Sequence, residues 1–409
     1  MPFDELVRQG SPSQFCQRQR HTARNSIERF CSMHTGNPNQ STYLPTLDGW
    51  RSVSIGLVLI WHSPISCTVP VLGALFRSLS HFGGVGVELF FGISGLLICS
   101  RLLEEESRHG QINVKRFYLR RFFRILPAAL FYLLTIAVLS ACHIIPLSLM
   151  DWLAALFFFR NYLMLFEYLH HSPLSLHWYT GHFWSLSMEE HFYLVLPALL
   201  VAFRSKRLYV LGGLALAIAM WRSVLAHIIH SRYQFTFRTD THVDALLIPA
   251  MFAVALYPLL RNPAARRYIP AWSFPVLAGL GVCLLVYDPP LSFTLRAILI
   301  PLLILSTVLH PKAIPGIILE SKPLRWIGWI SYSLYLWQQL FFGTNFAGSP
   351  PAIAILRHWP VNLVALMACA TFSYYVVEKP FIRLGHKLVS APKARDAFSI
   401  TTASTPTTS

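Results

Sequence analysis

Long apolar runs separated by short basic segments dominate this chain. Runs of about 16 to 23 residues with few charges are typical of membrane-spanning helices. Eleven runs qualify as candidates, namely Trp50–Leu72, His81–Ser100, Leu126–Ile145, Asp151–Phe166, Phe183–Phe203, Leu208–Ile229, Val243–Leu260, Trp272–Tyr287, Leu291–Leu309, Trp326–Phe346 and Val361–Val377. The pattern therefore predicts an all-α protein built within a membrane.

The basic residues between these runs predict how the chain crosses the membrane. Six clusters lie before Trp50, across Arg101–Arg124, at Arg204–Arg207, at Arg261–Arg267, at Lys312–Arg325 and after Lys379. The positive-inside bias places all six on the cytoplasmic side, so an even number of crossings separates neighbouring clusters. Three runs lie between the second and third clusters, and the weakest is Asp151–Phe166, which is short and contains Arg160 and Asn161. We predict an all-α polytopic integral membrane protein with about ten transmembrane helices, one further re-entrant or interfacial helix, and both termini in the cytoplasm.

Few residues are left for a second domain. Residues 1–46 are polar and basic and contain no apolar core of the length a secretory signal needs, so they are predicted to be a disordered cytoplasmic N-terminus. Residues 47–385 are predicted to form one transmembrane domain. Residues 386–409, rich in Thr and Ser, are predicted to be a disordered cytoplasmic tail.

Composition supports the membrane interpretation and excludes other classes. The chain of 409 residues is 54% hydrophobic and 13% charged, with a mean hydropathy of +0.48, values unlike those of a soluble domain of this length. The net charge of +16 lies mostly in the segments between apolar runs, which argues against nucleic-acid binding. The seven cysteines are scattered and contain no Cys-x-x-Cys, so neither a disulfide framework nor a zinc site is predicted from them.

Arg51 and His62 are ionisable residues within the first apolar run. Eleven residues separate them, which returns His62 to within roughly 20° of the helix face of Arg51 and about 16 Å deeper in the membrane. Both side chains are therefore expected to line one cavity. A histidine at this depth is a functional candidate, because it exchanges a proton near neutral pH while idle polarity in the bilayer is costly.

Glu88 is a lone carboxylate inside the second apolar run and needs a partner there. Three alternatives stay open from the sequence: it orients or charge-pairs His62, it binds a substrate, or it forms a structural pair with an arginine. The glycines around it, among them Gly86 and Gly95, are expected to allow close helix packing.

Four histidines, His170, His171, His177 and His182, crowd the predicted outer loop. Their spacing matches no familiar ligand pattern, so no metal site is predicted.

Seven segments, in order along the chain, resemble motifs of the acyltransferase family 3 membrane proteins. They are Leu47-Asp48-Gly49-Trp50-Arg51 with its Arg-x10-His spacing to His62, residues 84–98 (GVGVELFFGISGLLI), residues 120–127 (RRFFRILP), residues 183–194 (FWSLSMEEHFYL), residues 241–246 (THVDAL), residues 331–337 (SYSLYLW) and residues 377–381 (VEKPF). The resemblance runs from about Leu47 to Leu384. Ordered co-occurrence of so many segments makes it highly specific.

The resemblance implies transfer of an acyl group, usually acetyl from acetyl-CoA, to a hydroxyl of a glycan, a lipid-linked sugar or a small molecule in the bacterial inner membrane. Acyl-CoA would be a co-substrate, no cofactor would be permanently bound, and the other partners would be the hydroxyl-bearing acceptor and membrane lipid. An alcohol is a poor nucleophile at neutral pH and needs a general base, whereas a thioester donor needs neither metal nor ATP. His62 fits the base, and Glu88 is the second catalytic candidate.

Further residues acquire candidate roles in this reaction. Arg51, Arg120 and Arg124 are expected to bind CoA phosphates at the cytoplasmic entrance, because guanidinium groups bind phosphate in two-point fashion. Arg120 and Arg124 share a helix face and Arg121 is expected to point elsewhere. The alternative reading is that these arginines set the topology only. Acceptor-site candidates are Trp184, Ser187, Glu189, Glu190, His242 and Asp244.

Some positions depart from the family pattern. They are Gln338, where the family often has His, His191, where Gln is usual, His242, where Arg is frequent, and Pro249, where Gly is common. These departures are expected to mark an altered acceptor pocket. The competing functions are a proton-coupled transporter or flippase of a lipid-linked glycan, against which the absence of an inverted repeat argues, and a non-catalytic membrane scaffold.

Overall fold

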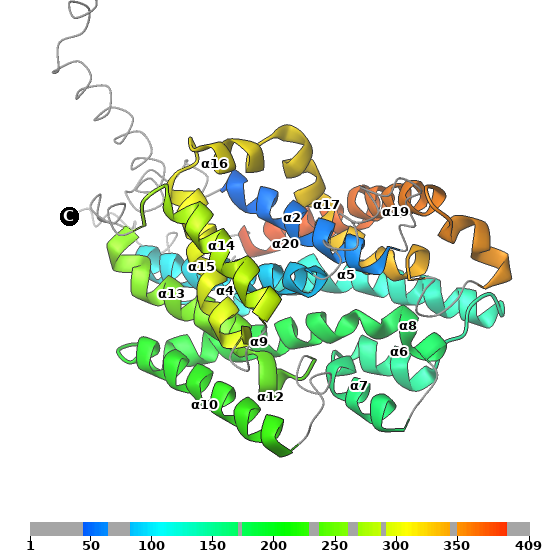
Figure 1. The fold of residues 1–409 in the computed structure, drawn as a ribbon, viewed down its shortest axis with the longest axis horizontal. Helices are drawn as coiled ribbons and strands as arrows, with labels where there is room; N and C mark the ends of the chain where they lie inside the picture. The colour runs from blue at the N-terminus through cyan, green and yellow to red at the C-terminus, as the bar shows by residue number, and fades with distance from the viewer. Residues whose placement is uncertain are drawn as a thin grey trace, which may run out of the picture.

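The structure is a computed structural model that describes residues 44–63, 82–170, 174–228, 237–260, 269–287, 292–343 and 350–390. These residues form helices and connecting turns and contain no β-strand. Figure 1 shows the helices packed into one bundle. The predicted all-α class is therefore confirmed for the described part of the chain.

The helices follow the predicted apolar runs closely. Their bounds are α2 Pro45–His62, α4 Gly83–His109, α5 Val114–Ala141, α6 Leu149–Leu156, α7 Arg160–Leu169, α8 Leu174–Gly181, α9 Phe183–Ala202, α10 Arg207–Ile228, α12 Thr239–His242, α13 Asp244–Leu260, α14 Ser273–Tyr287, α15 Ser292–Leu309, α16 Ile314–Leu319, α17 Lys322–Phe341, η2 Pro351–Arg357, α19 Val361–Phe372, the π-helical turn η3 Ser373–Glu378, and α20 Lys379–Ser390.

Five helical stretches in the described residues are long and apolar enough to cross a membrane. They are α4, α5, α10, α15 and the stretch Val361–Val389 that contains α19, η3 and α20. Shorter apolar segments occur in α13 and α14. The count of about ten spans stays a prediction.

Helix α4 lies at the centre of the bundle and packs against α2, α13, α15 and α9. Glycines on α4 allow this close packing. A Cβ atom at Gly86 would lie 2.5 Å from the carbonyl oxygen of Ser54 on α2, and one at Gly95 would lie 2.5 Å from that of Leu246 on α13. The expected packing role of these glycines is therefore confirmed.

Helix α2 ends earlier than predicted. The sequence pattern placed a span over Trp50–Leu72, but the helix ends at His62, and Ser63 is extended with φ −83° and ψ 125°. The reason is local, because Pro64 follows Ser63 and a residue before proline is disfavoured in the helical region. His62 thus lies at a helix end and not in mid-helix. Residues 64–81 are outside the described part.

The weak run Asp151–Phe166 is divided between α6 and α7, whose 8 and 10 residues are each too short to cross a bilayer. Phe158, in the left-handed region with φ 56°, lies between the two helices. Helices α6, α7 and α8 contact one another, and the group packs against α5, α9 and α17 (Figure 1).

The predicted domain limits stay predictions. The predicted disordered N-terminus is residues 1–46. Of these, residues 1–43 lie outside the described part, and α2 begins at Pro45. At the other end α20 continues to Ser390, past the predicted limit of 385. The rest of the predicted tail, residues 391–409, lies outside the described part.

Candidate active site

A basic cavity, here called the mouth, lies between α2, α4, α5, η3 and α20. Arginines from three helices line it: Arg51 from α2, Arg101 and Arg108 from α4, and Arg116, Arg120 and Arg124 from α5. Asp48, Glu104, Glu105 and Glu378 are also in its wall. The mouth thus gathers the basic ends of α4 and α5, which the sequence assigned to the cytoplasmic side.

A second cavity, here called the chamber, continues from the mouth into the bundle. The two share Arg51, Leu97 and Arg124. The further chamber residues are Val87, Phe90, Phe91, Ser94, Ile98, Arg121, Ile125, Ser185, Leu186, Glu189, Tyr193, Ser331, Tyr332 and Tyr335. The walls therefore change from charged at the mouth to aromatic and hydroxyl-bearing inside.

Like charges crowd the junction of mouth and chamber. Arg51 and Arg124 are close enough to repel each other, and Arg101 is repelled by Arg121, Arg51 and Arg124. Arg51 forms an ion pair with Asp48 at 3.3 Å, and Glu189 and Glu378 attract it from farther away. Such an excess of guanidinium groups around a cavity is a suitable environment for an anion.

Glu189 is a half-buried carboxylate in the wall of the chamber. Its Oε1 accepts a hydrogen bond from Ser94 Oγ at 2.8 Å, and its Oε2 accepts one from the Tyr193 hydroxyl at 3.1 Å. Arg121 and Arg51 attract it across the cavity. Glu189 was predicted as an acceptor-site residue, and the structure places it in the same cavity as the two arginines.

His62 lies at the end of α2, beside α8 and α17. Its Nδ1–H donates to the carbonyl oxygen of Val58 at 3.0 Å, which leaves Nε2 as the basic nitrogen. The ring meets that of Trp178 edge to face, with centroids 5.7 Å apart. The backbone N–H of Gly343 donates to the carbonyl of His62 at 3.0 Å. His62 is therefore held by its own helix, by α8 and by the end of the segment that follows α17.

The described residues link His62 to the chamber through His182. Tyr335, a chamber residue, donates to the carbonyl of His182 at 3.1 Å and contacts Ser185 Oγ at 2.6 Å. The His182 Nδ1–H donates to Gln339 Oε1 at 2.6 Å. His182 is also close enough to His62 for their charges to interact. A polar layer thus lies between the chamber and His62.

Glu88 has a firm partner elsewhere in the bundle. Both of its carboxylate oxygens accept hydrogen bonds from Arg296 of α15, at 2.7 and 2.9 Å, and both residues are buried. Of the three alternatives that the sequence left open, the structure displays the arginine pair. A catalytic role for Glu88 stays a prediction.

Asp244 forms a second buried pair of the same kind. Arg222 of α10 donates to Asp244 Oδ1 at 2.8 Å and to Oδ2 at 2.7 Å. The ring of Phe293 lies 5.5 Å from the Arg222 guanidinium, 4.8 Å from that of Arg296, and 4.8 Å from the His242 ring. One network therefore joins the two ion pairs and His242.

The other acceptor-site candidates lie apart. Trp184 packs between the rings of Phe91 and Phe237. Ser187 is wholly buried and donates to the carbonyl of Phe183 on its own helix. Glu190 is near Glu189 and Arg121. The structure thus brings only Glu189 of the six acceptor candidates into the chamber wall.

Arg121 was expected to point elsewhere than Arg120 and Arg124, but it shares a small cavity with both, so this prediction was wrong. It lines the chamber with Arg51 and Arg124, while its guanidinium lies 5.2 Å from the Tyr193 ring. The cavities wrap around α5, so side chains about 100° apart reach them from either side. Arg120 lines the mouth and the same small cavity, does not reach the chamber, and lies 3.2 Å from Glu105. The expected two-point convergence of Arg120 and Arg124 therefore describes only part of the basic wall.

Comparison with known proteins identifies the family. The acyltransferase domain of acyltransferase family 3 matches residues 44–378, so the chain belongs to that family. No solved structure matches the chain.

Three relatives illustrate the similarity. The chain is 28% identical over 392 residues to O-acetyltransferase OatA of Staphylococcus aureus strain MRSA252, covering 88% of this chain and 60% of OatA. It is 28% identical to a Bacillus subtilis strain 168 protein with the provisional name peptidoglycan O-acetyltransferase YrhL, covering 85% and 56%. It is 30% identical to a protein of Staphylococcus aureus strain COL, provisionally named an O-acetyltransferase, covering 85% and 59%. The chain thus spans less than two thirds of each relative.

Proposed function

We propose that the chain is a membrane O-acyltransferase that moves an acetyl group from cytoplasmic acetyl-CoA to a hydroxyl of a cell-envelope glycan. The supporting observation is the adjoining mouth and chamber, which share Arg51, Leu97 and Arg124, with guanidinium groups around the mouth and hydroxyl and aromatic groups in the chamber. The names of the relatives support O-acetylation, and that of YrhL supports a glycan acceptor.

The mouth suits the CoA end of the donor. Arg51, Arg101, Arg120 and Arg124 surround it, and phosphates are the anions that guanidinium groups bind best. In this proposal the phosphates stay at the mouth and the pantetheine arm extends along the chamber past Phe90 and Phe91. Binding the phosphates relieves the mutual repulsion of the arginines, which is a favourable contribution specific to an anionic donor.

His62 supplies the general base in this proposal. Its Nδ1–H is engaged with Val58, so Nε2 can accept the proton of the acceptor hydroxyl. The hydroxyl oxygen then attacks the thioester carbonyl, the C–O bond forms, and the C–S bond breaks. The CoA thiolate leaves and is protonated by the His62 imidazolium. The step needs no metal and no ATP.

The polar layer of Tyr335, Ser185 and His182 must open or rotate for the thioester to approach His62. This layer lies between the chamber and the outer end of α2. Placing donor and acceptor on opposite sides of such a layer favours a transfer across the membrane, with the donor inside and the acceptor outside.

Labelled acetyl-CoA tests the reaction. Membranes that contain the protein are expected to transfer label to envelope glycans, and membranes without it are not. Equal label in both would contradict the proposal.

Sealed vesicles test the sidedness. With acetyl-CoA enclosed on the face that carries the mouth, label is expected on an acceptor supplied at the other face. Label found only on acceptors enclosed with the donor would contradict transfer across the membrane while leaving the acyltransferase activity intact.

A further inference from the structure

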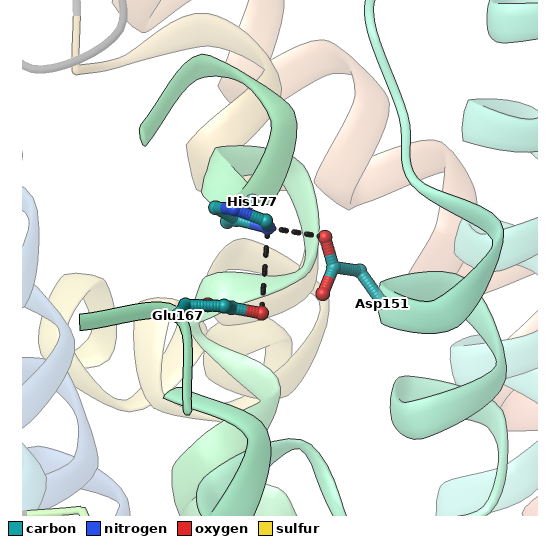
Figure 2. A group of neighbouring side chains, drawn as sticks. All are labelled: Asp151, Glu167 and His177. Carbon is teal, nitrogen blue, oxygen red and sulfur yellow. Dashed lines mark hydrogen bonds and ion pairs between the residues drawn. The ribbon is translucent and has the colours of Figure 1, made fainter. Parts of the chain in front are cut away.

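A buried cluster lies where α6, α7 and α8 meet. Figure 2 shows Asp151 of α6, Glu167 of α7 and His177 of α8 pointing toward one another. His177 Nδ1 lies 2.5 Å from Asp151 Oδ2 and 3.3 Å from Glu167 Oε1. Asp151 is 1% exposed and Glu167 is 9% exposed. The three side chains therefore converge away from solvent.

Arg160 holds the two carboxylates from their other oxygens. Its Nη2 lies 2.7 Å from Glu167 Oε2 and 3.8 Å from Asp151 Oδ1, and its Nε donates to Thr180 Oγ1 at 3.2 Å. Arg160 is wholly buried. The guanidinium thus hydrogen-bonds one oxygen of Glu167 and lies within ion-pair distance of one oxygen of Asp151, and the remaining oxygen of each carboxylate faces His177.

The cluster has fewer hydrogen-bond donors than its carboxylate oxygens require. A single N–H at His177 Nδ1 faces two carboxylate oxygens, and Glu167 Oε1 has no hydrogen-bond donor among the described residues. With neutral imidazole, the two carboxylates and one guanidinium leave a net charge of −1 in a buried place. The cluster therefore lacks positive charge at its centre.

We propose that Asp151, Glu167 and His177 bind a divalent metal ion, with zinc as the reference ion. Their ligand atoms all lie within 4.8 Å of one another, about twice the zinc–ligand distance of roughly 2.0–2.2 Å. One imidazole nitrogen and two carboxylate oxygens are ligands that zinc accepts. Arg160 would orient both carboxylates from outside, as hydrogen-bonded partners of ligands do in metal sites.

The site would have a structural consequence for His62. His177 is followed by Trp178, whose Nε1–H donates to the carbonyl of Gln339 at 2.8 Å and whose ring packs against that of His62. A bound ion would join α6, α7 and α8 at one point. It would thereby fix the helix that positions Trp178 against the proposed base.

Calorimetric zinc titration of the full chain, purified in detergent and first stripped with a chelator, tests the proposal. The wild type is expected to bind one equivalent. Glu167→Gln, which keeps the shape of the side chain, and His177→Ala are expected to weaken binding at least about tenfold. His227→Ala, which removes an exposed histidine of α10, is expected to bind like the wild type. Cobalt absorption spectra provide an independent reading of the ligand set.

The outcomes separate the alternatives. Absence of one-equivalent binding in the wild type, or equal affinity in the wild type, Glu167→Gln and His177→Ala, would overturn the site and leave a proton-sharing ion network. These readings use binding only, so they are independent of the proposed transferase activity.

Discussion

The bundle contains two contrasting groups of arginines, one around the mouth and chamber and one in the network of ion pairs around Phe293. In the network, Arg296 and Arg222 each meet one carboxylate through two hydrogen bonds. At the mouth and chamber, Arg51, Arg101, Arg121 and Arg124 repel one another. The first arrangement is balanced within the chain and joins helices. The second carries excess positive charge around a cavity, and this excess is what an anionic substrate would neutralise.

The largest effect on stability is expected from breaking a balanced pair. Glu88→Ala leaves Arg296 buried without its carboxylate and is expected to cost about 3–5 kcal/mol. Replacing both residues with leucine is expected to cost much less, since no charge is then left unpaired. Thermal unfolding in detergent measures both variants. If the single variant unfolds like the wild type, the pair is not a structural one.

A smaller effect on stability and a larger one on substrate binding are expected at the mouth. Arg124→Ala is expected to raise the KM for acetyl-CoA about ten- to hundredfold, the worth of one charge-assisted hydrogen bond. The melting temperature should change little, because the lost attraction to Glu378 offsets the relieved repulsion from Arg51. Arg383→Ala, on an exposed face of α20 outside the mouth, is the matched control. A fall in melting temperature with unchanged KM would place Arg124 with the structural arginines.

The smallest effect is expected at Arg120. This side chain is about one third exposed, lines the mouth but does not reach the chamber, and is already near Glu105. Solvent screening reduces its interaction, so Arg120→Ala is expected to raise the KM for acetyl-CoA only a few-fold, and less at high salt. Measuring KM at two ionic strengths tests this ranking. A larger change than that of Arg124→Ala would reverse the account of which arginines face the donor.

The sequence predicted the helices well because apolar length is a local property. It also contained the signal for the early end of α2, since His62-Ser63-Pro64 marks a helix boundary. Partners were harder to predict, because Glu88 meets a residue 208 positions away. Arg222 and Arg296 lie inside apolar runs, so the sequence indicates that both are buried. It does not indicate which carboxylate each of them pairs with.

The three proposed metal ligands were also hard to predict as a group from the sequence. The sequence pattern pointed to the histidines of the outer loop alone. Of these, His177 lies in the cluster, whereas His182 donates to Gln339 and His170 donates to the carbonyl of Phe166. His171 lies outside the described residues. Asp151 and Glu167 come from other helices, 26 and 10 positions before His177. The spacing of ligands along the sequence cannot predict this convergence, because it depends on the packing of the short helices α6, α7 and α8 and on the left-handed turn at Phe158.

The most direct test of the central claim compares His62→Ala with His227→Ala. In both histidines Nδ1–H donates to the carbonyl four residues earlier, at 3.0 and 2.8 Å, but His227 is exposed on α10. At matched expression, transfer of labelled acetyl from acetyl-CoA to envelope glycans is expected to fall about 10²- to 10⁴-fold in His62→Ala, the usual contribution of a general base, and to be unchanged in His227→Ala. Equal transfer by the wild type and His62→Ala would contradict the account.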